Sequence, residues 1–195
     1  MSSRDEILAR VRRSQPEPRG LPRIPAFDGP PGALVEAFKA GVLRMGGKVV
    51  EAPVEGDLDA LVTRLFPGAT VICSATPEVK GTRALDPEAA PATLDDVDVG
   101  VVRALYGIAE TGSLCLTTAQ FGVSALGFLA QHLVVLLDPG AIVPGLHEAY
   151  GRRADFDAPY TVFMTGPSAT ADIEGVLIHG AQGIRTLTVV PVAAP

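Results

Sequence analysis

The sequence has very few cysteines. Cys73 and Cys115 are its only two, they lie 42 positions apart, and neither belongs to a Cys-x-x-Cys pair. This pattern excludes a disulfide framework and a cysteine-ligated iron–sulfur cluster. We therefore expect any iron–sulfur chemistry to sit on a partner protein. Both cysteines lie in apolar segments, and we interpret them as small core residues.

Aromatic residues and excess positive charge are also scarce. Aromatics make up 5% of the sequence, with no tryptophan, so stacking surfaces for nucleic acid bases are few. The 16 Lys and Arg residues face 22 Asp and Glu residues, and the resulting net charge of −6 opposes binding to a phosphate backbone. Nucleic acid is therefore not expected as a partner.

Long apolar runs are absent as well. The longest, Leu133 to Leu137, is too short to cross a bilayer, and the first residues contain no apolar segment of the length found in secretory signals. These features predict a cytoplasmic protein with no membrane segment.

The sequence does contain enough apolar material for one folded domain. Its 195 residues are 47% hydrophobic and 19% charged, with a mean hydropathy of +0.30, which excludes a disordered chain and two large domains. The 21 glycines and 17 prolines allow many tight turns between short elements. We expect an aliphatic core crossed by a sheet with frequent connections.

The N-terminal segment 1–31 reads as separate from this domain. Residues 3–13 predict a short helix with Ser3 as N-cap and one apolar stripe of Ile7, Leu8 and Val11. Residues 14–31 carry six prolines, which predict an extended connector. The single domain is expected to span residues 32–195.

Helical and strand patterns alternate through that domain, with a long polar loop at 74–96. Continuous apolar strands such as LVVLL and TVVPV are typical of strands covered on both faces, so we predict a three-layer α/β fold with a mostly parallel central sheet. Predicted strands are 47–51, 69–73, 97–103, 114–118, 132–138, 160–165 and 186–192; predicted helices are 33–45, 57–66, 124–130, 142–152 and 170–179.

The first candidate site is the turn sequence YGIAETGS at 106–113. Its glycines permit close backbone approach, and its carboxylate and hydroxyls suit a catalytic base or nucleophile near the sheet. The alternative is a structural turn in which the carboxylate is solvated and the hydroxyls bond local amides. The candidate residues are Gly107, Glu110, Thr111, Gly112 and Ser113, with Glu110 as the catalytic candidate.

The second candidate site is the segment MTGPSATADIEG at 164–175. We expect it to run from a strand end into a helix, where backbone amides and the helix dipole favour a bound phosphate or carboxylate. The alternative is simple helix capping by the two acidic residues in the expected first turn. The candidate ligand-binding residues are Gly166, Ser168, Thr170, Asp172 and Glu174.

Other patterns carry no comparable chemistry. The dinucleotide fingerprint GxGxxG and the Walker pattern are absent. His132, His147 and His179 lie 15 and 32 residues apart, which is not a metal-ligand spacing, so no metal site is expected. The sequence Asp138-Pro139-Gly140 is read primarily as a turn.

Three segments together resemble the LUD-domain family, and within it the lactate utilisation protein C (LutC/YkgG) group. They are GIAETGSL at 107–114, HLVVLLDPGAIVPGLHEAY at 132–150 and GPSATADIEGVLIHGAQGIRTLTVVPV at 166–192. The resemblance covers roughly residues 32–192. It implies a fold similar to the NagB/RpiA/CoA-transferase-like proteins, in agreement with the α/β prediction.

The resemblance also implies a role in a three-component system that oxidises L-lactate to pyruvate. The partner proteins would carry the iron–sulfur clusters, and this chain would bind no cofactor itself. By the same resemblance, the AETG turn and the GPS-x-TADIE loop would border the site. Because both segments contain glycines and connect predicted strands to the next element, we expect them to share one crevice at the carboxyl ends of the parallel strands, where a small carboxylate or phosphate could bind. Two alternatives stay open: a free-standing isomerase, CoA-transferase or cyclo-ligase-like enzyme using Glu110, and a non-catalytic anion-binding regulatory subunit.

Overall fold

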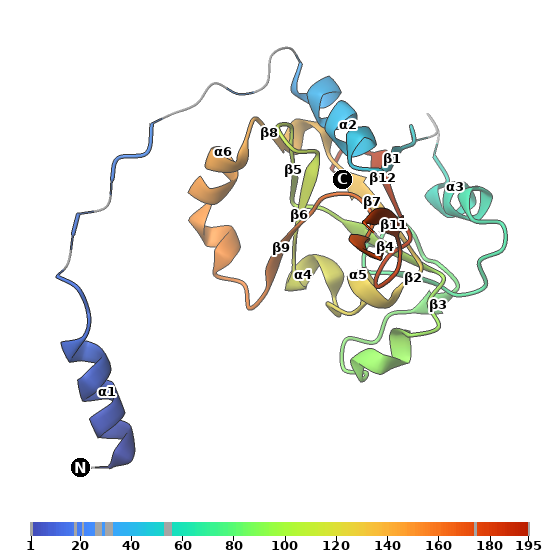
Figure 1. The fold of residues 1–195 in the computed structure, drawn as a ribbon. Coiled ribbons are helices and arrows are strands. Elements are labelled where there is room, and N and C mark those ends of the chain that lie inside the picture. Colours follow the sequence, from blue (N-terminus) through green and yellow to red (C-terminus); the bar gives the residue numbers. More distant parts are fainter. Residues whose placement is uncertain are drawn as a thin grey trace.

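Figure 1 shows the computed structural model of the chain, which describes residues 2–17, 19–20, 22–25, 29, 33–52, 56–173 and 175–194. Helix α1 (Ser3–Arg13) forms as predicted, although its N-cap is Ser2 rather than Ser3. The Ser2 hydroxyl accepts from the amide of Asp5, and the Asp5 carboxylate accepts from the amide of Ser2. This reciprocal pair closes the first turn of the helix.

Helix α1 contributes no buried residue to the fold. Ile7 and Val11 of its apolar stripe are 59% and 52% exposed. Between Ser14 and Ala33 the described residues form no helix or strand. Gly32, the predicted start of the domain, lies outside the described residues, so the division into 1–31 and 32–195 stays a prediction.

A six-stranded, wholly parallel sheet forms the centre of the domain. Every two neighbouring strands in this sheet run in the same direction. This confirms the predicted α/β class with a parallel central sheet. The strands, in spatial order, are β1 (Lys48–Val49), β12 (Thr186–Pro191), β7 (His132–Leu137), β4 (Val99–Arg103), β2 (Ile72–Ser74) and β3 (Arg83–Ala84).

Helix α3 (Leu58–Leu65) covers one face of this sheet. Asp57 caps the helix by accepting a hydrogen bond from the amide of Ala60. The apolar positions Leu61 and Val62 are buried against sheet residues that include Val134. Apolar residues on one side of the helix form a stripe that packs against the sheet.

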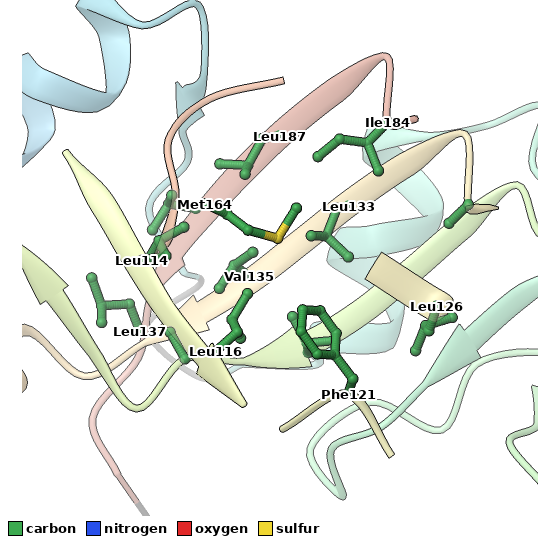
Figure 2. Packing of buried hydrophobic residues seen from close by; sticks show 14 of the residues in the cluster. Leu114, Leu116, Phe121, Leu126, Leu133, Val135, Leu137, Met164, Ile184 and Leu187 are labelled. Atoms are coloured by element: carbon green, nitrogen blue, oxygen red, sulfur yellow. The ribbon is translucent and has the colours of Figure 1, made fainter. Parts of the chain in front are cut away.

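A second sheet covers the opposite face. It contains β8 (Ile142–Val143), β5 (Tyr106–Ile108), β6 (Ser113–Thr117) and β9 (Thr161–Met164), in that order. Figure 2 shows Leu114 and Met164 of this sheet facing Val135 and Leu187 of the central sheet. The two sheets thus share one aliphatic core, as the low aromatic content predicts.

Helices pack around the second sheet. Helix α2 (Leu34–Arg44) buries Phe38 and Val42 in the shared core, and α4 (Thr118–Phe121) and α5 (Leu126–Leu129) lie between β6 and β7 in sequence. Helix α6 (Leu146–Gly151) packs its Ala149 on the outer face. In the described part of the chain, no helix is long and apolar enough to span a membrane.

The predicted helix over 170–179 is wrong. Strands β10 (Ala169–Ile173) and β11 (Val176–His179) form an antiparallel hairpin there. The β-branched residues Thr170 and Ile178 face each other in its register, and Gly175 adopts a φ of +71° at the turn. Branched side chains favour strands, and a glycine with positive φ favours a hairpin turn, so this local chemistry outweighs the acidic pattern that suggested a helix.

Two other predicted helices are shorter than expected. The pattern over 142–152 contains strand β8 and then α6, because Pro144 lacks the amide that a continuous helix would need. The pattern around 124–130 forms only α5, and α4 comes before it; between the two, Gly122 has a φ of +64°. Short 3₁₀ helices lie at Pro91–Leu94, Pro139–Ala141 and Arg153–Phe156.

Candidate functional site

A cleft of about 380 Å³ opens where β2, β4 and β7 end, and we call it the carboxyl-edge cleft. Ligands of parallel α/β sheets commonly bind at this edge, because the loops that leave the strands converge there. The polar residues that line the cleft are Thr76, Glu78, Arg103, Gln120 and Asp138.

An ion pair between Arg103 and Glu78 forms the centre of the cleft. Arg103 Nε donates to Glu78 Oε1 over 2.6 Å, and Nη2 lies 2.5 Å from the same oxygen. The other oxygen of Glu78 accepts from the hydroxyl of Thr76. Both charged side chains are largely shielded, with 20% and 17% of their surface exposed.

The guanidinium of Arg103 is engaged through all three of its nitrogens. Nη1 donates to the backbone oxygen of Val192 over 3.2 Å. Nη2 is buried and is ion-paired with Glu78 Oε1, although this contact lacks the geometry of a hydrogen bond. One oxygen of Glu78 therefore faces both Nε and Nη2, whereas the two oxygens of a bidentate carboxylate would match this pair of donors better.

The remaining polar side chains of the cleft are held by local caps. Asp138 follows β7, and its Oδ1 accepts from the amide of Gly140 over 2.9 Å, as the expected turn requires. Gln120 Oε1 accepts from the hydroxyl of Thr117 over 2.6 Å in the capping box of α4. These contacts fix the side chains in place before any ligand arrives, which reduces the entropy cost of binding.

Arg103 is the group of the cleft that could recognise a small carboxylate, and it would do so against the negative charges of Glu78 and Asp138. A guanidinium presents paired donors that match the two oxygens of a carboxylate, and hydroxyl and amide groups beside it can orient the rest of a small molecule. The volume of about 380 Å³ lies within the usual range for small-ligand sites.

Glu110 lies in the turn between β5 and β6 and contacts α6. Its Oε2 accepts from the amide of Leu146 over 2.9 Å, and its own amide donates to the oxygen of Pro144. The side chain is exposed and does not line the carboxyl-edge cleft. This geometry matches a cap on the first turn of α6, and the catalytic role of Glu110 stays a prediction.

The glycines of the same turn allow close packing of α2. Gly112 has a φ of +72°, and a Cβ at this position would lie 2.3 Å from the amide nitrogen of Val42. A Cβ on Gly107 would lie 2.9 Å from the ring of Phe38. Both glycines therefore serve contact between the turn region and the helix.

The GPS loop, residues 165–168, meets the first motif through hydroxyl groups. Ser113 Oγ lies 2.6 Å from Thr111 Oγ1 and 2.6 Å from Thr165 Oγ1. Gly166 has a φ of +79°, and a Cβ there would lie 2.2 Å from the backbone oxygen of Met45, just after α2. The structure thus brings the two motifs together at the end of α2.

The expected position of this loop at the carboxyl ends of the strands is wrong. Ser168 N donates to the oxygen of Ile184, two residues before β12 begins, so the loop lies at the amino-terminal edge of the sheet. The Ser168 hydroxyl donates to the oxygen of Gln182. The strand β10 formed there in place of a helix removes the expected helix N-terminus.

The acidic candidates of the second motif do not form a site with Glu110 among the described contacts. Asp172 Oδ2 accepts from the hydroxyl of Thr170 over 2.9 Å within β10, and its side chain is exposed. Glu174 lies outside the described residues. The ligand-binding roles of these residues stay predictions.

Sequence reasoning missed the pair of Arg103 and Glu78. A pattern that could have revealed the cleft was present, because the apolar strands VGVVR and HLVVLL are each completed or followed by a charged residue, Arg103 and Asp138. Charged groups at the carboxyl ends of neighbouring buried parallel strands indicate a functional edge. Where the structure describes side chains, it contains no group of three or more His, Cys, Asp or Glu that could hold a metal ion.

Comparison with known proteins gives one family and few relatives. The family model of the LUD domain matches residues 81–192. The uncharacterized protein NMB1437 of Neisseria meningitidis is 31% identical over 100 residues, covering 50% of this chain and 43% of the relative. The uncharacterized protein YkgG of Escherichia coli is 30% identical over 95 residues, covering 46% and 41%. The matches thus span less than half the length of these relatives.

A solved structure supports the fold. The crystal structure of a DUF162 family protein from Deinococcus radiodurans superposes with a TM-score of 0.63 and 18% identity, covering 82% of this chain and 96% of the other. At this identity the likeness concerns the architecture alone.

Proposed function

Because the chain belongs to the LUD-domain family, we propose that it is a component of an L-lactate utilisation system and binds a small 2-hydroxy or 2-oxo carboxylate in the carboxyl-edge cleft. The family resemblance supplies the metabolic context. The cleft supplies the chemistry, since its central guanidinium is suited to a carboxylate.

The observation that carries the proposal is the shielded guanidinium of Arg103 in the cleft. Its Nε donates to Glu78 Oε1 over 2.6 Å, and its Nη2 lies 2.5 Å from the same oxygen, so one carboxylate oxygen takes both contacts. A ligand carboxylate that displaces Glu78 could present one oxygen to Nε and the other to Nη2 in the paired geometry. Binding is therefore an exchange of one carboxylate for another on the same guanidinium.

The proposed oxidation also has to account for the electrons that it releases. Conversion of L-lactate to pyruvate releases two electrons and two protons, which need an acceptor. Cys73 and Cys115 are both buried and lie on different sheets, so neither belongs to a cysteine cluster within this chain. The electrons would pass to iron–sulfur partner proteins, while this chain would hold the organic acid.

Calorimetry with L-lactate and pyruvate tests the binding half of this proposal. The full chain should bind at least one of the two acids, and Arg103→Gln should weaken that binding by about tenfold or more, the loss of roughly one charge-assisted contact. Glu78→Gln should strengthen binding, because the competing carboxylate is gone. The control Arg64→Gln alters an exposed arginine of α3 outside the cleft and should bind like the wild type.

Equal affinity of Arg103→Gln and the wild type would contradict the assignment of the cleft. The partner half is tested separately, by anaerobic purification of the tagged chain from its native host. Co-elution of iron–sulfur proteins, together with loss of growth on lactate in the Arg103→Gln strain, is the expected result. A chain that elutes alone and a variant that grows normally would contradict the role in lactate utilisation.

A further inference from the structure

A second cleft of about 360 Å³ lies at the opposite edge of the central sheet, and we call it the amino-edge cleft. We propose that it binds a small oxyanion, a carboxylate or a phosphate, between His132 and Arg185. This site is independent of the proposed lactate function, since it shares no lining residue with the carboxyl-edge cleft. Its lining residues include Phe66, Asp98, Gln131, His132 and Arg185.

The beginnings of three neighbouring strands bring these groups together. Asp98 comes directly before β4, His132 is the first residue of β7, and Arg185 comes directly before β12. Because β4, β7 and β12 are adjacent and parallel, their first residues must meet at one edge. The turn after α3, which contains Phe66, forms the facing wall.

The orientation of the His132 ring is fixed by two contacts. Its Nδ1 lies 2.8 Å from the hydroxyl of Thr186, and its ring stacks on Phe66 with the centroids 4.8 Å apart and an interplanar angle of 28°. Nε2 has no hydrogen-bond partner among the described residues. When Nδ1 accepts from Thr186, Nε2 carries the proton and is a donor even in the neutral ring.

Arg185 supplies an available positive charge at the same place. Its side chain is exposed, and within the described chain no carboxylate forms an ion pair with it. Lys48 of β1 is a second cation close enough to affect His132 electrostatically. Arg185 and Lys48 thus give this edge of the sheet a local positive charge, although the whole chain has a net charge of −6.

The one carboxylate of the cleft is already engaged. Asp98 Oδ2 accepts from Thr70 N, from the Thr70 hydroxyl and from Val71 N, at 2.7, 2.9 and 2.9 Å. These bonds hold the pKa of Asp98 below its usual range and tie its charge to the turn before β2. With Arg185 and Lys48 against Asp98, the balance stays positive while His132 is neutral.

Protonation of His132 should respond to a bound anion. Burial lowers the pKa of His132, and the positive charge of Arg185 lowers it further, while Asp98 opposes this effect. An anion seated between the imidazole and the guanidinium favours the protonated ring. Binding and protonation therefore strengthen each other by linkage.

NMR titration of the imidazole rings tests the proposal, because the full chain has only three histidines. Ring shifts of His132, His147 and His179 are followed against pH in chloride, in inorganic phosphate and in acetate at equal ionic strength. We expect phosphate, acetate or both to raise the pKa of His132 by about one unit, with little change at the other two rings. A response to phosphate alone assigns a phosphate ligand, and a response to acetate assigns a carboxylate.

Two variants make the result specific. Arg185→Gln should abolish the anion effect on His132, and Arg64→Gln, an exposed arginine outside the cleft, should leave it intact. The proposal is overturned if neither anion moves His132 more than His147 and His179. It is also overturned if Arg185→Gln responds like the wild type.

Discussion

Arg103 and Glu78 are 25 residues apart in sequence, yet Arg103 Nε donates to Glu78 Oε1 over 2.6 Å. The same guanidinium donates through Nη1 to the backbone oxygen of Val192. Three segments that are distant in sequence are thus held at one point: the loop after β2, the end of β4 and the residues after β12. Substitution of either charged residue should affect the shape of the cleft as well as its charge.

The first prediction concerns the energy of this ion pair. Because both side chains are largely shielded from water, their coupling free energy in a double-mutant cycle should be about 1–3 kcal/mol, larger than that of an exposed pair. The cycle uses Glu78→Gln, Arg103→Met and the double variant, each unfolded in urea. Additive effects of the two substitutions would show that the contact does not stabilise the fold.

The second prediction concerns the contact between the turn and α2. Gly112→Ala should destabilise the protein by about 3 kcal/mol or more, because it combines a positive φ with a Cβ pressed against the backbone at Val42. Gly68→Ala is the matched control, since a Cβ there meets nothing within 4 Å and Gly68 has no positive φ. Thermal melts compare the two variants, and equal melting temperatures would contradict the packing role of Gly112.

The third prediction separates a capping role of Glu110 from a catalytic one. If Glu110 mainly caps α6, Glu110→Ala should lose about 1 kcal/mol of stability, while Glu110→Gln retains an acceptor oxygen for Leu146 and stays near the wild type. With a capping role alone, both variants should support growth on lactate. Normal stability with lost growth in Glu110→Gln would instead assign the catalytic role considered from the sequence.

The central sheet could be predicted from the sequence because its strands carry their own pattern. Apolar residues point to both faces of the strands VGVVR, HLVVLL and TLTVVP. This pattern is typical of parallel strands that are buried on both faces. The second sheet was less visible, because Tyr106–Ile108 and Ile142–Val143 are too short to show an alternation. In the segment that forms the hairpin of β10 and β11, the acidic residues suggested the first turn of a helix. Gly175 at the turn and the β-branched residues favour the hairpin that the structure shows.

The ion pair of Glu78 and Arg103 could not be predicted, even though the charged residues that end or follow β4 and β7 point to a functional edge. The contact of Glu78 with Arg103 depends on the order of β2 and β4 in the sheet, which no local pattern specifies. Residue type alone showed only that Arg103 ends a buried strand. The motifs that were recognised, AETG and GPS, meet each other at the end of α2 through Ser113 and Thr165 and do not line the carboxyl-edge cleft.

The fourth prediction concerns pH. The folded pKa of His132 lies below its ordinary value of 6.5, so the unfolded chain binds this proton more readily than the folded one. The contribution of His132 to stability is therefore complete above about pH 6.5 and declines as the pH falls below that value toward the folded pKa. Urea unfolding at pH 7.5 and 5.5 should show this loss, and it should be smaller in His132→Gln. An equal loss of unfolding free energy in His132→Gln and the wild type would contradict this role of His132.

The fifth prediction concerns the N-terminal segment. Because α1 buries no residue, a chain that lacks residues 1–32 should still unfold in one cooperative transition, close to the melting temperature of the full chain. Differential scanning calorimetry compares the two proteins. An insoluble or non-cooperative product would show that α1 or the connector contributes to the fold.

The position of Ala194 has a practical consequence for how this protein is handled. Ala194 lines the carboxyl-edge cleft, three residues after β12 ends. A purification tag, fluorescent fusion or surface anchor joined directly after Ala194 would begin beside the cleft, where it can obstruct small molecules. The same appendage placed before α1 is separated from the cleft by the proline-rich connector. Binding assays and immobilised formats should therefore attach the protein through its N-terminus.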